Sequence, residues 1–352
     1  MSDKNAWPLG EMIAQLGARA RGDERARIEA SPQFARGRFR NAVPTAGISA
    51  AAMPRVALAT ASGQDSRRPH LPVPMRAAGP HDATGLHVTW YGHSSVLVEI
   101  EGHRVLIDPV WSRRCSPSRH AGPQRLHEPP VALHTLPSVD VVVISHDHYD
   151  HLDMTTVQEL SASHDPLFVT PLGVGAHLRH WGVPDSRIVE LDWNESTRAG
   201  DLELVATPAR HFSGRGLHRD DTLWAGWVIK GPSRRVFYSG DTGYFPGFAE
   251  IGAEHGPFDV TLVQVGAYDE TWPDIHMLPE DGVRAHQDVR GGLLIPVHWA
   301  TFDLALHDWS EPADRTWRAA KDNDVNLAVP RPGERVDVDA PPPVDGWWQL
   351  VA

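Results

Sequence analysis

The sequence predicts an α/β fold in which two β-sheets pack face to face with helices outside, an αββα sandwich. Strand candidates outnumber helix candidates, they fall into two groups along the chain, and helix candidates lie between the strands. Because apolar sheet faces need to be covered, we infer two packed sheets with helices on their outer faces.

The first strand group begins after Gly85 with three short, alternating or β-branched runs separated by glycine, which is typical of a meander. The apolar run Val-Val-Val-Ile-Ser then predicts a fully buried strand. The predicted strands are 86–91, 95–101, 104–108, 140–145, 168–170 and 187–191. The predicted helices are 155–161 and 174–180.

The second strand group has the same character and carries the remaining helices. Its predicted strands are 202–207, 224–229, 236–239, 260–265 and 293–297. The predicted helices are 248–255, 279–288 and 313–323.

Residues 1–84 differ from this body and are interpreted as a basic, Pro/Arg-rich N-terminal arm that packs on a catalytic domain over 85–352. Residues 1–80 carry 12 Lys and Arg against 6 Asp and Glu, although the whole chain has a net charge of −12. We expect a short helix over 12–28 and an extended segment over 31–80. The favoured interpretation is a solvated arm lying over the acidic body. Contact with anionic lipid headgroups is the alternative, and without interleaved aromatic residues no nucleic acid is expected.

Three features of the sequence bear on its compartment. It has no stretch of about 18 apolar residues that could cross a membrane, and its first residues lack the apolar core of a signal peptide. Cys115 is the only cysteine, which excludes an intramolecular disulfide and a cysteine-cluster zinc site. We therefore expect a cytoplasmic protein, with peripheral membrane contact if the arm binds lipid.

The strongest chemical signal is the sequence Ser-His-Asp-His-Tyr-Asp-His-Leu-Asp at 145–153, directly after the buried strand. His146 and His148 are two residues apart, so in an extended segment they point the same way and can bind one metal. Asp150 and His151 follow where the chain turns, and can bind a second metal. Imidazole and carboxylate suit zinc, with manganese or iron as alternatives.

Three further ligand candidates each follow an apolar strand. They are His211, Asp241 within Gly-Asp-Thr-Gly, and His298. The glycines beside Asp241 allow a tight turn and a close approach of the backbone to a metal. Each residue alone is more often an ordinary loop residue, but together with 146–151 they complete two metal sites.

These motifs resemble the binuclear pattern of the metallo-β-lactamase superfamily, and more closely the N-acyl-phosphatidylethanolamine phospholipase D group and its bacterial relatives. The resemblance extends over about residues 85–310. Besides 145–153, it rests on 90–95 (Trp-Tyr-Gly-His-Ser-Ser), 106–109 (Leu-Ile-Asp-Pro), 224–227 (Trp-Ala-Gly-Trp), 240–244 (Gly-Asp-Thr-Gly-Tyr), 256–259 (Gly-Pro-Phe-Asp), 266–268 (Gly-Ala-Tyr) and 298–302 (His-Trp-Ala-Thr-Phe).

The resemblance implies the metallo-β-lactamase type of αββα sandwich and a role for each ligand at two zinc ions, with manganese or iron possible in their place. One metal takes His146, His148 and His211, and the other takes Asp150, His151 and His298. Asp241 bridges them.

The resemblance also implies a hydroxide between the two metals as the nucleophile. Asp150 orients the hydroxide or accepts its proton. His93 and Asp108, in the early motifs, are expected to support ligands, with a purely structural turn as the alternative.

The substrate is indicated by His276, which matches a histidine near the phosphate in the related lipases. The preceding Ile275 replaces a Gln of that group. The expected activity is hydrolysis of a phospholipid-like phosphodiester, and the expected partner is a small-molecule or lipid substrate.

Three alternative functions fit the sequence less well. The first is a lactonase or β-lactamase-type acyl hydrolase on the same metals. An iron-binding oxidoreductase of this fold would carry Glu at the place of His148. A scaffold without catalysis would be expected to have lost ligands, and none is missing.

Overall fold

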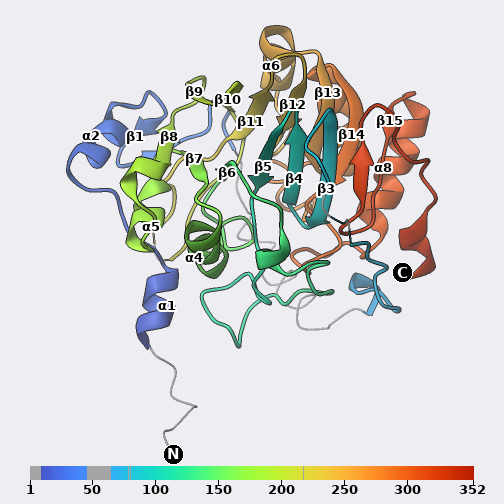
Figure 1. Ribbon diagram of the computed structural model, residues 1–352, viewed down its shortest axis with the longest axis horizontal. Coiled ribbons are helices and arrows are strands. Elements are labelled where there is room, and N and C mark those ends of the chain that lie inside the picture. The colour runs from blue at the N-terminus through green and yellow to red at the C-terminus, as the bar shows by residue number, and fades with distance from the viewer. Residues whose placement is uncertain (1–8, 46–64, 78, 80, 217) are drawn as a thin grey trace, which may run out of the picture.

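Two seven-stranded sheets and flanking helices form an αββα sandwich, which confirms the predicted fold class (Figure 1). The computed structural model describes residues 9–45, 65–77, 79, 81–216 and 218–352. Both sheets are mixed: in each of them, some neighbouring strands pair in antiparallel fashion and the others pair in parallel. None of the described helices is long and apolar enough to cross a bilayer.

The elements fall into two sheets and two helical layers. In order across the first sheet, the strands are β16 (Arg335–Asp337), β3 (Leu86–Gly92), β4 (Ser95–Ile100), β5 (His103–Ile107), β6 (Val141–Val143), β7 (Leu167–Pro171) and β8 (Ile188–Leu191). Across the second they are β15 (Asn326–Leu327), β14 (Gly291–Val297), β13 (Phe258–Gln264), β12 (Arg235–Tyr238), β11 (Gly226–Lys230), β10 (Leu202–Thr207) and β9 (Ser196–Ala199). The flanking helices are α4 (Met154–Ser163), α5 (Gly175–His180), α6 (Gly247–His255), α7 (Pro279–Asp288) and α8 (Glu311–Asp322).

The alternation of side chains along the strands explains this layering. In β4, Val96 and Val98 join the apolar core between the sheets, and Leu97 joins a second core. That second core lies against α4 and α5, and a third core packs the other sheet against α6, α7 and α8. Because neighbouring residues of a strand point to opposite faces, a strand that is apolar throughout serves two cores at once.

Strands β9, β15 and β16 were not predicted from the sequence. Each lies at an edge of its sheet, and β15 and β16 are only two and three residues long. Edge strands are commonly short and polar, so they lack the apolar run that marks a central strand. They add coverage at the edges and leave the predicted centre of both sheets unchanged.

The N-terminal arm begins with two helices where the sequence predicted one over 12–28, so that prediction was wrong. The helices are α1 (Leu9–Gln15) and α2 (Gly22–Ala30). Gly17, between the helices, has φ +73°, and Gly22, the first residue of α2, has φ +56°. This left-handed backbone is easy for glycine and cannot continue a helix.

The described part of the arm packs on the body. Figure 1 shows α1 and α2 beside α5, and the indole of Trp181, just after α5, donates a 2.7 Å hydrogen bond to the Ala14 carbonyl. Ile28 and Phe39 are buried within the core between the sheets. After α2, β1 (Phe34–Ala35) and β2 (Arg38–Phe39) form a small hairpin. Residues 46–64 of the segment predicted as extended lie outside the described residues, and the division into an arm and a catalytic domain stays a prediction.

Candidate metal centre

The fold brings the ligand candidates from both sheets together. The 146–151 segment follows β6 of the first sheet, whereas His211, Asp241 and His298 follow β10, β12 and β14 of the second. Their ligand atoms form overlapping groups in which all members lie within 4.8 Å of one another. Residues separated by as many as 152 positions in the sequence thus meet at one place.

One ligand set consists of His146, His148 and His211. The Nε2 atom of His146 lies 2.8 Å from Nδ1 of His148, and the Nε2 atom of His211 lies 3.3 Å from the same Nδ1. His146 and His211 are buried, and His148 is partly exposed. The three imidazoles therefore present nitrogen atoms to a common point.

The other set consists of Asp150, His151 and His298. The Oδ2 atom of Asp150 lies 3.5 Å from Nε2 of His151 and 3.3 Å from Nε2 of His298. Both histidines are fully or almost fully buried. The structure thus brings together this predicted set as well.

Asp241 lies between the two sets. Its Oδ2 atom is 3.0 Å from Nε2 of His151 and 2.9 Å from Nε2 of His298. The same oxygen is 3.9 Å from the Nε2 atoms of His146 and His211. This position fits the bridging role that was predicted for it.

Several atoms at the centre of this cluster fit a bound cation. Within the described part of the chain, Nε2 of His151, Nε2 of His298 and Oδ1 of Asp241 are buried without a hydrogen-bond partner. Most buried polar atoms have a partner. Nitrogen and carboxylate donors gathered in this way suit zinc, and also manganese or iron.

The two sets differ in their electrostatics. Burial, with help from neighbouring imidazoles, lowers the pKa of His146 and of His211 well below the usual value, and burial also lowers that of His148. These rings are therefore neutral at pH 7, which is the form that binds a metal.

In the second set burial also disfavours the charged form of His298. The carboxylates of Asp241 and Asp150 outweigh it and raise the pKa of His298 to about 9. The pKa values of both carboxyl groups are held well below the usual range, because neighbouring histidines outweigh the cost of burying the charge. This set therefore carries negative charge that a proton or a metal cation has to balance.

Asp108 contacts His151 of the second set at Nδ1, the ring nitrogen opposite the one that faces Asp241. Its Oδ2 accepts hydrogen bonds from Nδ1 of His151 at 2.7 Å and from the Tyr238 hydroxyl at 2.5 Å, and its Oδ1 accepts one from the Ser145 amide at 2.7 Å. With its proton on Nδ1, His151 directs the lone pair of Nε2 at the site. Sequence analysis missed Tyr238, because a tyrosine in an apolar strand gives no sign of its partner.

His93 contacts Asp150. Its Nε2 atom lies 2.9 Å from Oδ2 of Asp150, and its ring centre lies 4.1 Å from that of His298. The Thr301 hydroxyl accepts the amide hydrogen of His93, and the His93 carbonyl accepts that of His298. His93 thus connects the two ligands Asp150 and His298.

His276 lies next to the metal centre, although no sequence motif connects it to the seven ligand candidates. Its Nδ1 atom is 3.9 Å from Oδ2 of Asp241, and its ring centre is 5.1 Å from those of His211 and His298. Burial lowers the pKa of His276 to about 3. The preceding Ile275 contributes through its carbonyl, which lies 3.0 Å from Nδ1 of His211.

Comparison with known proteins identifies the family and the fold of the chain. Residues 103–299 match the model of a β-lactamase superfamily domain. An uncharacterized protein of Mycobacterium tuberculosis is 52% identical over 344 residues, which cover 96% of this chain and 92% of that protein. The N-acyl-phosphatidylethanolamine-hydrolyzing phospholipase D 1 of Caenorhabditis elegans is 36% identical over 248 residues, 67% of this chain and 70% of the relative.

A solved structure shares the fold. It is a metallo hydrolase from the archaeon Ignicoccus hospitalis, which superposes with a TM-score of 0.55 at 23% identity, covering 71% of this chain and 97% of that one. This likeness extends to the αββα architecture.

Proposed function

The chain belongs to the metallo-β-lactamase superfamily of metal-dependent hydrolases, and from that premise we propose that it hydrolyses a phosphodiester bond in a phospholipid-like substrate. The similarity to a Caenorhabditis elegans enzyme named for hydrolysis of N-acyl-phosphatidylethanolamine supports this substrate class. The structural observation that carries it is the place of His276, beside Asp241 and between the rings of His211 and His298.

In this proposal the two ligand sets would hold two cations, most simply zinc, and Asp241 would contribute to both sets. When bound, such a pair would lower the pKa of a water molecule and stabilise charge on the phosphoryl oxygens. His146, His148 and His211 are kept neutral for binding by burial. Asp108 fixes the orientation of His151.

Two other side chains act on the substrate and the water. Asp150 is ionised and its Oδ2 lies 2.9 Å from Nε2 of His93, so this oxygen would accept a hydrogen bond from the attacking water and orient it. His276 has a lowered pKa of about 3 and is neutral at pH 7, and its buried Nδ1 has no hydrogen-bond partner among the described residues. A neutral imidazole with a free ring nitrogen is suited to contact a phosphoryl oxygen.

An apolar cluster beside the centre fits the acyl part of such a substrate. It contains Trp272 and Ile275, with Phe212 packed against it. The Phe212 ring centre lies 4.5 Å from that of His148. Apolar walls next to a few polar groups are typical of sites for amphiphilic ligands.

The test is a comparison of substrates on protein of known metal content. We expect purified protein to approach two equivalents of transition metal. We expect it to cleave N-acyl-phosphatidylethanolamine or a chromogenic phosphodiester faster than a lactone or a β-lactam. His276→Ala should lower the phosphodiesterase rate and leave the metal content unchanged. If lactones or β-lactams are hydrolysed far faster, and His276→Ala changes neither rate, the metal centre serves acyl hydrolysis instead.

A further inference from the structure

Asn41 of the N-terminal arm bonds both polar groups of the His211 main chain. Its Nδ2 donates to the His211 carbonyl at 2.8 Å, and its Oδ1 accepts from the His211 amide at 3.0 Å. The same Oδ1 accepts a 2.9 Å hydrogen bond from the indole of Trp224, a buried core residue. A primary amide offers a donor and an acceptor side by side. The two bonds between Asn41 and His211 therefore fix the position of the His211 main chain, which carries the imidazole.

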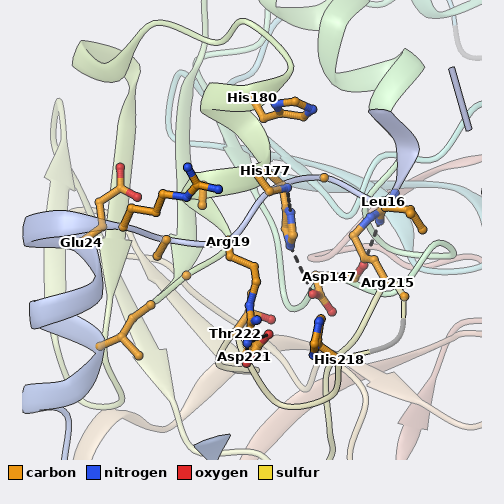
Figure 2. Close-up of a pocket in the computed structure, with 18 of the residues that line it drawn as sticks. Leu16, Arg19, Glu24, Asp147, His177, His180, Arg215, His218, Asp221 and Thr222 are labelled. Atoms are coloured by element: carbon orange, nitrogen blue, oxygen red, sulfur yellow. Dashed lines mark hydrogen bonds and ion pairs between the residues drawn. The ribbon is translucent and has the colours of Figure 1, made fainter. Parts of the chain in front are cut away.

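A second contact from the arm reaches Asp147, the residue between His146 and His148. Nδ1 of His177 accepts a 3.0 Å hydrogen bond from the Ala18 amide. The ring hydrogen is therefore on Nε2, which lies 3.3 Å from Oδ2 of Asp147 (Figure 2). The arm is thus connected through one imidazole to the loop that carries two ligands.

A third contact runs through Arg215, which is 4% exposed. Its Nη1 donates to the Asp147 carbonyl at 2.8 Å and to the Leu152 carbonyl at 2.7 Å. Its Nε donates to the Gln15 carbonyl in the arm at 3.0 Å. Figure 2 shows Arg215 beside Asp147 at the same cavity that His177 lines.

That cavity, of about 910 Å³, lies between the arm and the body. Ala18, Asp147, His177 and Arg215 all line it. The cavity separates the arm from the body. At the cavity, His177 and Arg215 each hydrogen-bond a residue of the arm and contact Asp147 of the body. Loss of the arm would open Asp147 and the metal-binding loop to water.

We propose that the N-terminal arm is part of the metal centre and that Asn41 is a positioning residue for the ligand set His146, His148 and His211. Asn41 bonds the main chain of His211 directly, whereas the arm approaches His151 through Arg215, a residue of the body that bonds the Leu152 carbonyl. Asn41 therefore controls occupancy of one metal position, and its loss should leave the other unaffected. The proposal rests on the two-metal centre of the proposed function and is independent of its substrate.

The experiment measures zinc bound to the full chain after dialysis against a series of buffered free-zinc concentrations. We expect two equivalents for the wild-type protein. In Asn41→Ala the affinity of one equivalent should fall by about 10–100-fold, the range typical when a residue that supports a ligand is lost. The affinity of the other should stay unchanged. Asn41→Asp, which keeps the acceptor and loses the donor, should lie between.

Two control variants separate this effect from general loosening of the arm. Thr45→Ala removes the hydroxyl that accepts a 2.9 Å hydrogen bond from Asn41 and leaves the His211 contact in place. Arg27→Met removes an exposed 2.7 Å ion pair between the arm and Glu195. Both should bind two equivalents with wild-type affinity. The melting temperature of each metal-free variant shows whether stability changes separately.

Gly17→Ala provides an independent test should Asn41→Ala fail to fold. Gly17 has φ +73°, and a Cβ there would overlap Nδ1 of His177, so the contact from Ala18 would be displaced. The same equivalent of zinc should weaken. If Asn41→Asp and Gly17→Ala both bind two equivalents with wild-type affinity, the proposal is wrong. If the wild-type chain binds fewer than two, the two-metal centre itself fails, whatever Asn41 does.

Discussion

The two ligand sets of the metal centre lie within a few ångströms of each other but are supported from different parts of the molecule. Asp150, His151 and His298 are backed by the body, where Asp108 bonds His151 and is itself bonded by Tyr238 of a central strand. The set that contains His211 is backed by the arm as well as by the body: Asn41 bonds the His211 main chain, and the Ile275 carbonyl lies 3.0 Å from Nδ1 of His211. One half of the centre thus relies on the core of the sandwich, and the other half relies on the arm as well.

The same two halves differ in charge. The arm-backed half consists of three imidazoles that burial keeps neutral. The body-backed half contains ionised carboxylates, and their attraction raises the pKa of His298 to about 9. A metal enters the first half without displacing a proton, whereas in the second half it replaces the protons of His151 and His298, whose pKa values are both raised.

The largest effect is expected at the residue that belongs to both halves. Asp241→Asn removes the negative charge between the two sets, so both cations should be held weakly. We expect hydrolytic activity to fall by more than about 100-fold, beyond the range typical of residues that only support ligands. Circular dichroism should still show a folded protein, because apolar strands form the core. Wild-type turnover with both metals bound would show that Asp241 is not shared.

A change at Asp108 should affect the body-backed half most. Asp108→Asn exchanges an acceptor of four hydrogen bonds for an amide that has to place its NH₂ group towards one of the donors. We expect about 10–100-fold weaker binding of one metal, with a smaller effect on the arm-backed site, which Asp108 reaches only through the Ser145 hydroxyl beside His146. Zinc titration of the apoprotein measures this effect. Combining Asp108→Asn with Asn41→Ala should weaken both sites, and weakening of the same site by each would contradict the division.

The pH dependence of metal binding should separate the halves without mutation. The pKa of His298 is raised above 6.5, so its proton stabilises the metal-free fold fully below about pH 6.5, and this contribution is lost as the pH rises through about 9. Binding at that half should strengthen by about tenfold per pH unit for each proton released, and the pKa of His151 is raised as well. Calorimetry in two buffers of different ionisation enthalpy measures the number of protons released. Equal pH dependence of both sites would count against the electrostatic difference.

The smallest effect is expected from Tyr238→Phe. It removes one of the four hydrogen bonds to the Asp108 carboxylate and keeps the aromatic ring in the core. The free energy of unfolding should fall by about 1 kcal/mol, with both metals retained. Urea denaturation of the metal-free protein checks this value. A loss of metal as large as in Asp108→Asn would mean that the hydroxyl, and not the carboxylate alone, orients His151.

The sequence predicted the centre of the fold well because central strands carry their own signal. The apolar run that ends at Ser145 marks a buried strand, and β6 lies in the interior of its sheet, between β5 and β7. The same local reasoning found the ligand cluster that follows it. It failed where the signal is not apolar, as in the short edge strands, and where two glycines divide an otherwise helical segment at Gly17 and Gly22.

By itself the sequence determined which side chains are available as metal ligands, because strand alternation and the 146–151 spacing are local properties of the chain. Only the tertiary structure decided which distant groups support them. Asn41 meets His211 across 170 residues, Tyr238 meets Asp108 across 130, and His276 lies beside Asp241 after an irregular loop. Such contacts depend on how two sheets and an arm are stacked in space. No periodicity or motif in the sequence encodes that stacking residue by residue.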